Sequence, residues 1–323
     1  MRATAAVAMA ALLLCSWPQT IAQPVSATCG PQSGALGVSR VVEIDASAGP
    51  RFGNLQYKDL NFLKDGEVVL TFDDGPSRQH TPAVLAALDA HCTKATFFSV
   101  GRMAISDPEM LRETARRGHT IGTHTWSHKN LGSLSPAAAR QEIELGISAV
   151  QAALGQPVAP FFRFPYLSDP QSAQALLKER GIGIFSIDAD SYDYRTPSGA
   201  VIQRNILQQL TSRKKGIILF HDIQASTARG LKGLLDELKA RNFRVVHLVA
   251  KAPVVTVAEF DAMAGQALGK KQIADSRNTL NRRSVVWPVS QEPAASAPSS
   301  APARAPRPPV EEDDWRAKVF GRR

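Results

Sequence analysis

The sequence predicts an α/β fold built around a parallel barrel. Short apolar runs alternate with longer stretches of helical character through the middle of the chain, and strands that alternate with helices form a parallel sheet with helices outside. The runs VVLTF, GIILF and RVVHLV are continuously apolar, which is typical of strands buried on both faces. Seven such units favour a barrel, with an open doubly wound sheet as the alternative. The expected strands are residues 67–72, 95–100, 120–122, 161–164, 182–187, 216–221 and 243–249.

Four helices are expected to begin at a capping residue followed by proline. A side-chain oxygen at the N-cap accepts a hydrogen bond from an unpaired backbone N–H, and proline fits the first helical position because its missing N–H costs nothing there. The four expected starts are Thr81-Pro82, Asp107-Pro108, Ser135-Pro136 and Asp169-Pro170.

Both ends of the chain are expected to lie outside the main folded domain, which we place at residues 66–252. Residues 1–22 have the composition of a cleaved secretory signal, because the apolar core after Arg2 is too short to span a membrane and small residues follow it. An uncleaved anchor is the alternative. We expect an exported protein, periplasmic or secreted, with no transmembrane segment after signal removal. The remaining segments are an N-terminal extension (23–65), a C-terminal extension (253–290) and a Pro/Ala-rich tail (291–323) that is expected to be disordered.

Removal of the signal would leave two cysteines, Cys29 and Cys92. An even pair in an exported chain can form a disulfide, and two unpaired buried thiols are the alternative. The formal net charge of +9 raises the question of nucleic-acid binding, but the basic residues are scattered and no Lys/Arg stripe carries interleaved aromatics. We therefore expect no nucleic-acid partner. Attraction to acidic envelope polymers fits an exported protein better.

Polar residues follow five of the expected strands, all at the same end. In a parallel barrel the carboxyl ends of the strands form one mouth, where the chemistry of such folds takes place. Five polar groups would therefore converge there. They are Asp73-Asp74, the segment 124–128, the segment 163–166, Asp190 with Asp193, and His221.

The residue types at this mouth point to a metal-dependent hydrolase. His124 and His128 are four positions apart and would lie on one face of a helical turn, where both imidazoles can bind one cation. A carboxylate from Asp73 or Asp74 would complete a three-ligand site with positions open for water and substrate. The other carboxylate would accept a proton from the attacking water, and His221 would protonate a leaving group. Taken singly, the histidine pair and the aspartate pair would instead indicate surface residues and a turn.

The remaining histidines lack a position at the end of a strand. We expect them to be structural or exposed: His80, His91, His119 and His247.

Five motifs occur in order between about residues 66 and 250: TFDDGPS, HTWSH, RFPY, DSYDY and LFH. They resemble the motifs of polysaccharide deacetylases of the NodB-homology type, carbohydrate esterase family four. The resemblance implies a distorted (β/α)7 TIM-like barrel over residues 66–252. It also implies a metal-dependent hydrolase that removes acetyl groups, above all from N-acetylglucosamine-type sugars, in an envelope or extracellular polysaccharide or oligosaccharide. The implied cation is Zn²⁺, with Co²⁺ or Ni²⁺ as alternatives.

The resemblance also implies a role for each residue of the metal half of the site. Asp73 would be the catalytic base, and Asp74 would bind the cation together with His124 and His128. Arg163 would hold and tune Asp73.

The other half of the site would complete the reaction. The backbone N–H of Tyr166 would help to stabilise the oxyanion, where fixed donors contribute most. His221 would be the general acid, oriented by the carboxylate of Asp193, which also favours the protonated imidazole. Leu219 would line the pocket for the acetyl methyl group, and Tyr194 would contact the sugar.

Two residues depart from the family pattern, and both would border the sugar groove. Tyr194 stands where tryptophan is usual, and Leu167 stands where a small residue is common. Asp190 is close enough in sequence to compete with Asp193 for His221. Two other functions stay open: a catalytically silent carbohydrate-binding protein on the same scaffold, and a hydrolase of a non-sugar amide.

Overall fold

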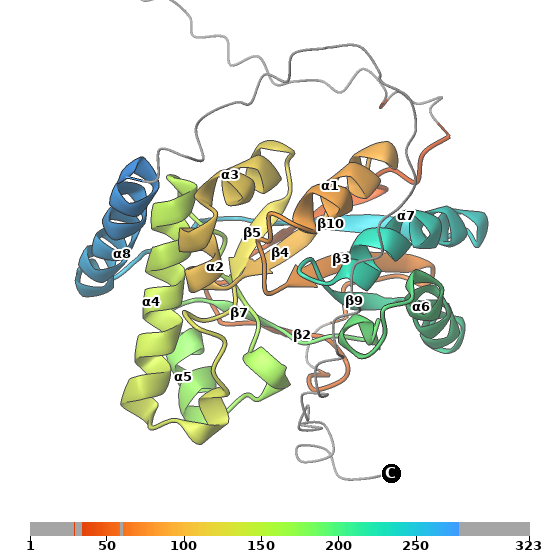
Figure 1. Ribbon diagram of the computed structural model, residues 1–323. Coiled ribbons are helices and arrows are strands. Elements are labelled where there is room, and N and C mark those ends of the chain that lie inside the picture. The colour runs from red at the N-terminus through yellow and green to blue at the C-terminus, as the bar shows by residue number, and fades with distance from the viewer. Residues whose placement is uncertain (1–28, 30–33, 59–60, 278–323) are drawn as a thin grey trace, which may run out of the picture.

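The computed structural model describes residue 29 and residues 34–58 and 61–277 (Figure 1). The predicted signal (1–22) and the predicted tail (291–323) lie outside these residues. Within the described part of the chain, no helix is both long and apolar enough to cross a membrane.

In the described part of the chain, ten parallel strands form one sheet that curves into a barrel. The sheet contains all seven predicted strands and three short ones that were not predicted, β1, β2 and β8. The strands are β1 (Arg40–Ile44), β2 (Arg51–Phe52), β3 (Glu67–Asp73), β4 (Thr96–Ser99), β5 (Thr120–Thr123), β6 (Phe161–Phe162), β7 (Gly183–Phe185), β8 (Ala189–Asp190), β9 (Gly216–His221) and β10 (Arg244–Ala250).

The helices surround the strands (Figure 1). Most of them connect one strand to the next, as expected for a parallel barrel. They are α1 (Thr81–Ala90), α2 (Gly101–Ser106), α3 (Pro108–Arg116), α4 (Pro136–Leu154), α5 (Gln171–Glu179), α6 (Gly199–Arg213), α7 (Ala225–Ala240) and α8 (Ala258–Arg277), with short 3₁₀ turns η1 (Leu131–Ser133), η2 (Pro165–Leu167) and η3 (Asp193–Arg195).

The ring closes through one stretch of chain that changes partner. Neighbouring strands follow the order β9, β3, β4, β5, β6, β7. At the end of this order β7 pairs with β6. The chain then continues into β8, which begins four residues after β7 and pairs with β9, the first strand of the order. A doubly wound sheet would leave two open edges at these positions, so the predicted distorted (β/α)7 barrel is confirmed. Strands β1 and β2 from the N-terminal segment add to the sheet beside β10 and β7.

Strand β3 directs its side chains alternately to two cores, because successive residues of a strand point to opposite faces. Val68, Leu70 and Phe72 belong to the large cluster that packs under the helices. Val69 belongs to the smaller cluster inside the barrel. Asp73 has the same parity as Val69, so the carboxylate at the end of this strand enters the barrel mouth.

Two of the four predicted helix starts are confirmed. The Asp107 carboxylate accepts a hydrogen bond from the N–H of Met110 at the start of α3, and the Ser135 hydroxyl accepts one from the N–H of Ala138 at the start of α4. Each side chain satisfies a backbone donor that the helix leaves unpaired.

The other two predicted starts are wrong by one residue. His80 is the N-cap of α1, and the hydroxyl of Thr81 donates instead to the buried carboxylate of Asp222. Helix α5 begins two residues after Asp169, whose carboxylate accepts a hydrogen bond from the hydroxyl of Tyr57. In both cases the side chain that was expected to cap the helix forms a hydrogen bond with a residue distant in sequence.

Cys29 and Cys92 form a disulfide across a sequence separation of 63 residues. The bond ties the segment before β1 to the end of α1, and it excludes the alternative of two unpaired thiols. Such a bond stabilises the fold mainly by restricting the unfolded chain.

A paired glutamate at the other end of β3 joins the N-terminal segment to the barrel. The guanidinium of Arg40 on β1 donates to both carboxylate oxygens of Glu67, at 2.9 and 2.7 Å, and Glu67 is 3% exposed. The hydrogen bonds from Arg40 outweigh burial and lower the pKa of Glu67 to about 2.

We expect Glu67→Gln to lower the free energy of unfolding by about 2 kcal/mol at pH 7, because it leaves a half-buried guanidinium without its charged partner. A lowered carboxyl pKa stabilises the fold above the unfolded value and loses that effect as the pH falls toward the folded value. The difference between wild type and variant should therefore shrink from about pH 4.5 toward pH 2. Urea denaturation across this range measures it. Glu109→Gln, in an exposed pair with Arg112, is the control, and an equal loss in both variants would contradict the assignment.

Candidate active site

The two adjacent aspartates share one site because β3 ends between them. Asp73 is the last residue of the strand, and Asp74 has a left-handed backbone with φ of 77°. This conformation breaks the strand's alternation, so the second carboxylate does not point to the opposite face. Asp73 is buried, and the side chain of Asp74 is 19% exposed at the mouth.

The histidine segment is a loop after β5, so the predicted helical turn is wrong. Thr125 and His128 both have left-handed backbones, with φ of 64° and 59°. The Thr125 hydroxyl accepts a hydrogen bond from the N–H of His128 at 3.0 Å. This fold of the loop, and not helical periodicity, brings the rings of His124 and His128 to a centroid distance of 4.9 Å.

Asp74, His124 and His128 form a three-ligand group. Oδ1 of Asp74 lies 3.2 Å from Nε2 of His128 and 3.5 Å from Nε2 of His124. Donor atoms of the three residues lie within 4.8 Å of one another. One carboxylate and two imidazoles are the donor set that binds Zn²⁺ in many hydrolases.

Two observations show that these residues fit a cation. Oδ1 of Asp74 is buried without a hydrogen-bond partner in the described part of the chain, and such an atom requires a partner. Nδ1 of His124 lies 2.7 Å from the carbonyl oxygen of Arg163, so this nitrogen carries the proton and the lone pair of Nε2 faces Asp74. Burial lowers the pKa of His124 to about 3, so the ring is neutral at pH 7 and able to bind a metal.

Arg163 fixes Asp73 from inside the barrel. The fully buried guanidinium donates from Nη1 to Oδ1 of Asp73 and to the hydroxyl of Thr71, both at 2.7 Å. Carbonyl oxygens of Phe185 and Ser186 accept its remaining hydrogen bonds at 3.1 Å. The group therefore cannot rotate away from the carboxylate.

The second oxygen of Asp73 faces the three-ligand group, with Oδ2 at 3.9 Å from Nε2 of His124. Burial raises the pKa of Asp73 to about 6, against the lowering effect of Arg163 and His221. A carboxylate with a pKa near neutrality can accept a proton during a reaction at pH 7.

His221 lies beside Asp73 because β3 and β9 are paired in register, with these two residues opposite each other. Nδ1 of His221 is 2.7 Å from Oδ1 of Asp193, and Oδ2 of Asp193 accepts from the backbone N–H of His221 and from the hydroxyl of Thr227. Burial disfavours the charged imidazole, but the carboxylate of Asp193 and those at the end of β3 outweigh it and raise the pKa of His221 to about 10.

The structure places Asp193, and not Asp190, on His221. The carboxylate of Asp190 instead accepts a hydrogen bond from the N–H of Tyr192 at 2.9 Å. The ring of Tyr194 lies edge-on to His221 at a centroid distance of 5.5 Å.

Three further predicted residues border the same mouth. The ring of Tyr166 lies 4.7 Å from that of His128 and its backbone is left-handed, with φ of 58°. Leu219 forms a small buried cluster with Leu167 and Ile187. The bulky Leu167 therefore supplies apolar surface beside the predicted acetyl pocket.

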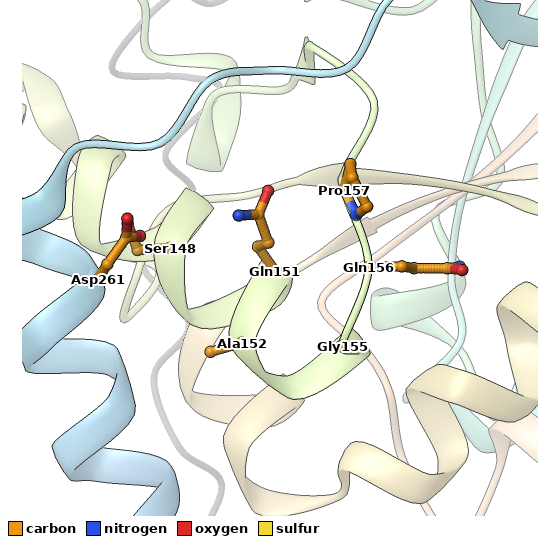
Figure 2. Close-up of a pocket in the computed structure, with 7 residues that line it drawn as sticks. All are labelled: Ser148, Gln151, Ala152, Gly155, Gln156, Pro157 and Asp261. Carbon is orange, nitrogen blue, oxygen red and sulfur yellow. The ribbon is translucent and has the colours of Figure 1, made fainter. Parts of the chain in front are cut away.

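The other histidines lie away from the mouth. His80 stands at the N-cap of α1, His91 faces Asp236 of α7, Nδ1 of His119 accepts from a backbone N–H, and His247 contacts Thr120. A separate cavity of about 410 Å³ between α4 and α8 contains none of the predicted site residues (Figure 2).

Asp222 is a buried carboxylate next to the aspartate turn that was not predicted from the sequence. A Cβ at Gly75 would overlap the carboxylate of Asp222, so only glycine allows this approach. The hydroxyl of Thr81 donates to the same oxygen, and burial raises the pKa of Asp222 to about 7. A second charged residue directly after the LFH motif was the available signal, but it was indistinguishable from a residue in a turn.

Comparisons with known proteins identify the family of this chain. The sequence pattern that defines the family "Polysaccharide deacetylase" matches residues 62–184. A chitooligosaccharide deacetylase of Azorhizobium caulinodans is 32% identical over 194 residues, which cover 54% of this chain and 90% of that protein. A peptidoglycan-N-acetylglucosamine deacetylase of Listeria monocytogenes is 29% identical over 247 residues, covering 72% of this chain and 51% of that protein. The chain thus spans about half the length of the Listeria relative.

A solved structure shares the fold. The peptidoglycan deacetylase of Bdellovibrio bacteriovorus superposes with a TM-score of 0.62 and 35% sequence identity, covering 69% of this chain and 62% of the other. The chain belongs to the polysaccharide deacetylases of the NodB-homology type, carbohydrate esterase family 4.

The contact between Asp193 and His221 predicts a change in titration. Asp193→Asn removes the carboxylate that favours the imidazolium, so the midpoint of His221 should fall by about 1 to 3 pH units. NMR titration of the ring nitrogens measures it in the metal-free protein. Asp190→Asn is the matched control and should leave His221 unchanged. An unaltered midpoint in the Asp193 variant would refute the assignment.

Proposed function

We propose that the protein is a metal-dependent deacetylase that removes N-acetyl groups from N-acetylglucosamine-type sugars in an envelope or extracellular polysaccharide. The observation that carries this proposal is the meeting of three residues able to bind a cation, a buried carboxylate and a histidine paired with a second carboxylate at one barrel mouth. Both relatives reported above are named for N-acetylated sugars. The donor set of Asp74, His124 and His128 favours Zn²⁺, with Co²⁺ or Ni²⁺ as alternatives.

A bound cation would supply Lewis-acid chemistry, polarising the acetyl carbonyl and acidifying water. In the proposed reaction Asp73, held by Arg163, accepts the proton of the attacking water. The backbone N–H of Tyr166 donates to the oxyanion that develops on the carbonyl oxygen.

Beside Asp73, on the neighbouring strand, His221 donates its proton to the leaving amine, and Asp193 keeps the ring oriented and charged until then. Leu219, with Leu167 beside it, would receive the acetyl methyl group, and Tyr194 would contact the sugar ring. The pairing of β3 with β9 supports these two roles, because it brings the proposed base and the proposed acid to the same mouth.

We also propose that the protein acts outside the cytoplasm. The Cys29–Cys92 disulfide supports this, because such bonds form and persist in oxidising compartments. The signal-like residues 1–22 support it from the sequence, and residues 66–252 would be the catalytic domain.

The activity test is the release of acetate from chitooligosaccharides, peptidoglycan and acetylated xylan by the Zn²⁺-loaded protein. We expect release from one or both N-acetylated substrates and less from xylan. Binding to these glycans without acetate release would favour the silent carbohydrate-binding protein. Neither binding nor release, with cleavage of a small amide, would favour the non-sugar amidase.

The two aspartates should separate metal binding from turnover. Asp73→Asn should retain metal and lose turnover by about 10²- to 10⁴-fold, because it removes the proton acceptor. Asp74→Ala and His128→Ala should lose metal and activity together. Metal content by plasma mass spectrometry and acetate release measure the two effects. Retained turnover in the Asp73 variant would disprove its role as base.

A further inference from the structure

The loop that carries both histidines is held from outside by helix α4. Two of its residues have left-handed backbones, Thr125 and His128, and each such residue costs free energy unless surrounding contacts enforce it. The N–H of Trp126 donates to the carbonyl oxygen of Glu142 at 2.8 Å. Backbone N–H groups at the start of α2 donate to the carbonyl oxygens of Thr125 and Trp126 at 2.9 Å.

Helix α4 approaches this loop so closely that one position must be glycine. A Cβ at Gly146 would lie 2.5 Å from the carbonyl carbon of Thr125 and 2.8 Å from the nitrogen of Trp126. Glycine lowers the stability of a helix interior, so this approach has a structural reason. Glu142 lies four residues earlier, on the same face of the helix.

The carboxylate of Glu142 binds the residue that directly precedes His128. Its Oε2 accepts from the N–H of Ser127 at 2.9 Å, and its Oε1 accepts from the Ser127 hydroxyl at 2.7 Å. Lys129 is the residue that directly follows His128, and its Nζ lies 3.2 Å from Oε1 of Glu142. Glu142 is 5% exposed, so water competes weakly for these hydrogen bonds.

His124 and His128 are therefore anchored differently. The carbonyl of Arg163 holds the ring of His124 directly, whereas His128 is 27% exposed as a side chain and depends on the backbone of its loop. The described contacts of Glu142 are to that backbone and its neighbours, and none is to the ring of His128.

We propose that Glu142 is a positioning residue for the metal site: by clamping Ser127 it fixes the backbone of His128 and aims this ring at Asp74. The proposal rests on the proposed function, in which Asp74, His124 and His128 bind a cation. Partners of this kind change metal affinity by about 10- to 100-fold when they are removed. Because Glu142 has no described hydrogen bond to Asp74 or His124, binding should weaken and not vanish.

Glu144 provides a matched control on the same helix. It is also buried, at 1% exposure, and its carboxylate accepts two hydrogen bonds from Arg180, at 2.9 and 3.2 Å, away from the histidine loop. Removal of Glu144 should therefore destabilise the protein without changing its affinity for a cation. If Glu142 had a purely structural role, its removal would likewise destabilise the protein without changing its affinity for a cation.

The test is a competition titration of Zn²⁺ against a chromophoric chelator at pH 7.5, with the folded fraction checked by circular dichroism. We expect Glu142→Ala to bind Zn²⁺ about 10- to 100-fold more weakly than wild type, and Glu144→Ala to bind within threefold of wild type. Glu142→Gln retains one acceptor oxygen and should fall between. It also serves if the alanine variant does not fold.

The outcomes separate the two proposals. Equal affinity of wild type and the Glu142 variants would overturn the positioning role and leave the proposed function intact. Equal weakening in the Glu142 and Glu144 variants would also overturn it, because the effect would then be general destabilisation. Absence of Zn²⁺ binding by wild type would overturn the metal site itself and the positioning role with it.

Discussion

Two carboxylates side by side at the end of a buried strand repel each other and resist desolvation. The fold gives each carboxylate a different set of neighbours. Asp73 receives the fully buried guanidinium of Arg163, and Asp74 turns through a left-handed backbone toward two imidazoles. A cation at Asp74 would remove the remaining repulsion and would give the two residues different chemistry. The adjacent sequence positions are thus electrostatically distinct sites in the folded protein.

The pairing and side-chain direction of the barrel strands bring the polar residues of the site together. The register between β3 and β9 sets His221 opposite Asp73, and the parity of β3 sends Asp73 into the same lumen that Arg163 occupies. The carbonyl of Arg163 orients His124 while its side chain holds Asp73, so one residue supports both the proposed base and a member of the three-ligand group. Helix α4 supports His128 from outside through Glu142. Both histidines of the three-ligand group are therefore held through residues that lie outside this group.

Much of the architecture followed from local pattern. Continuous apolar runs located all seven main strands, and the polar residues at their ends located the mouth. The errors have one kind of cause. Thr81 and Asp169 were expected to cap helices, but their side chains form hydrogen bonds with Asp222 and Tyr57 instead. The His124–His128 spacing suggested a helical turn, and the structure shows a loop with two left-handed residues. In each case a contact distant in sequence outweighed the local preference.

Residue type and strand ends alone predicted which side chains meet at the mouth, because the carboxyl ends of parallel strands lie together whatever the details of their packing. Which nitrogen of His124 carries the proton, which aspartate orients His221, and which glutamate holds the histidine loop depended on tertiary contacts. Hydrogen bonds of this kind join residues such as Glu142 and Ser127, or Asp193 and His221, 15 and 28 positions apart. Their geometry arises when the helices pack on the barrel, and sequence spacing carries no record of it.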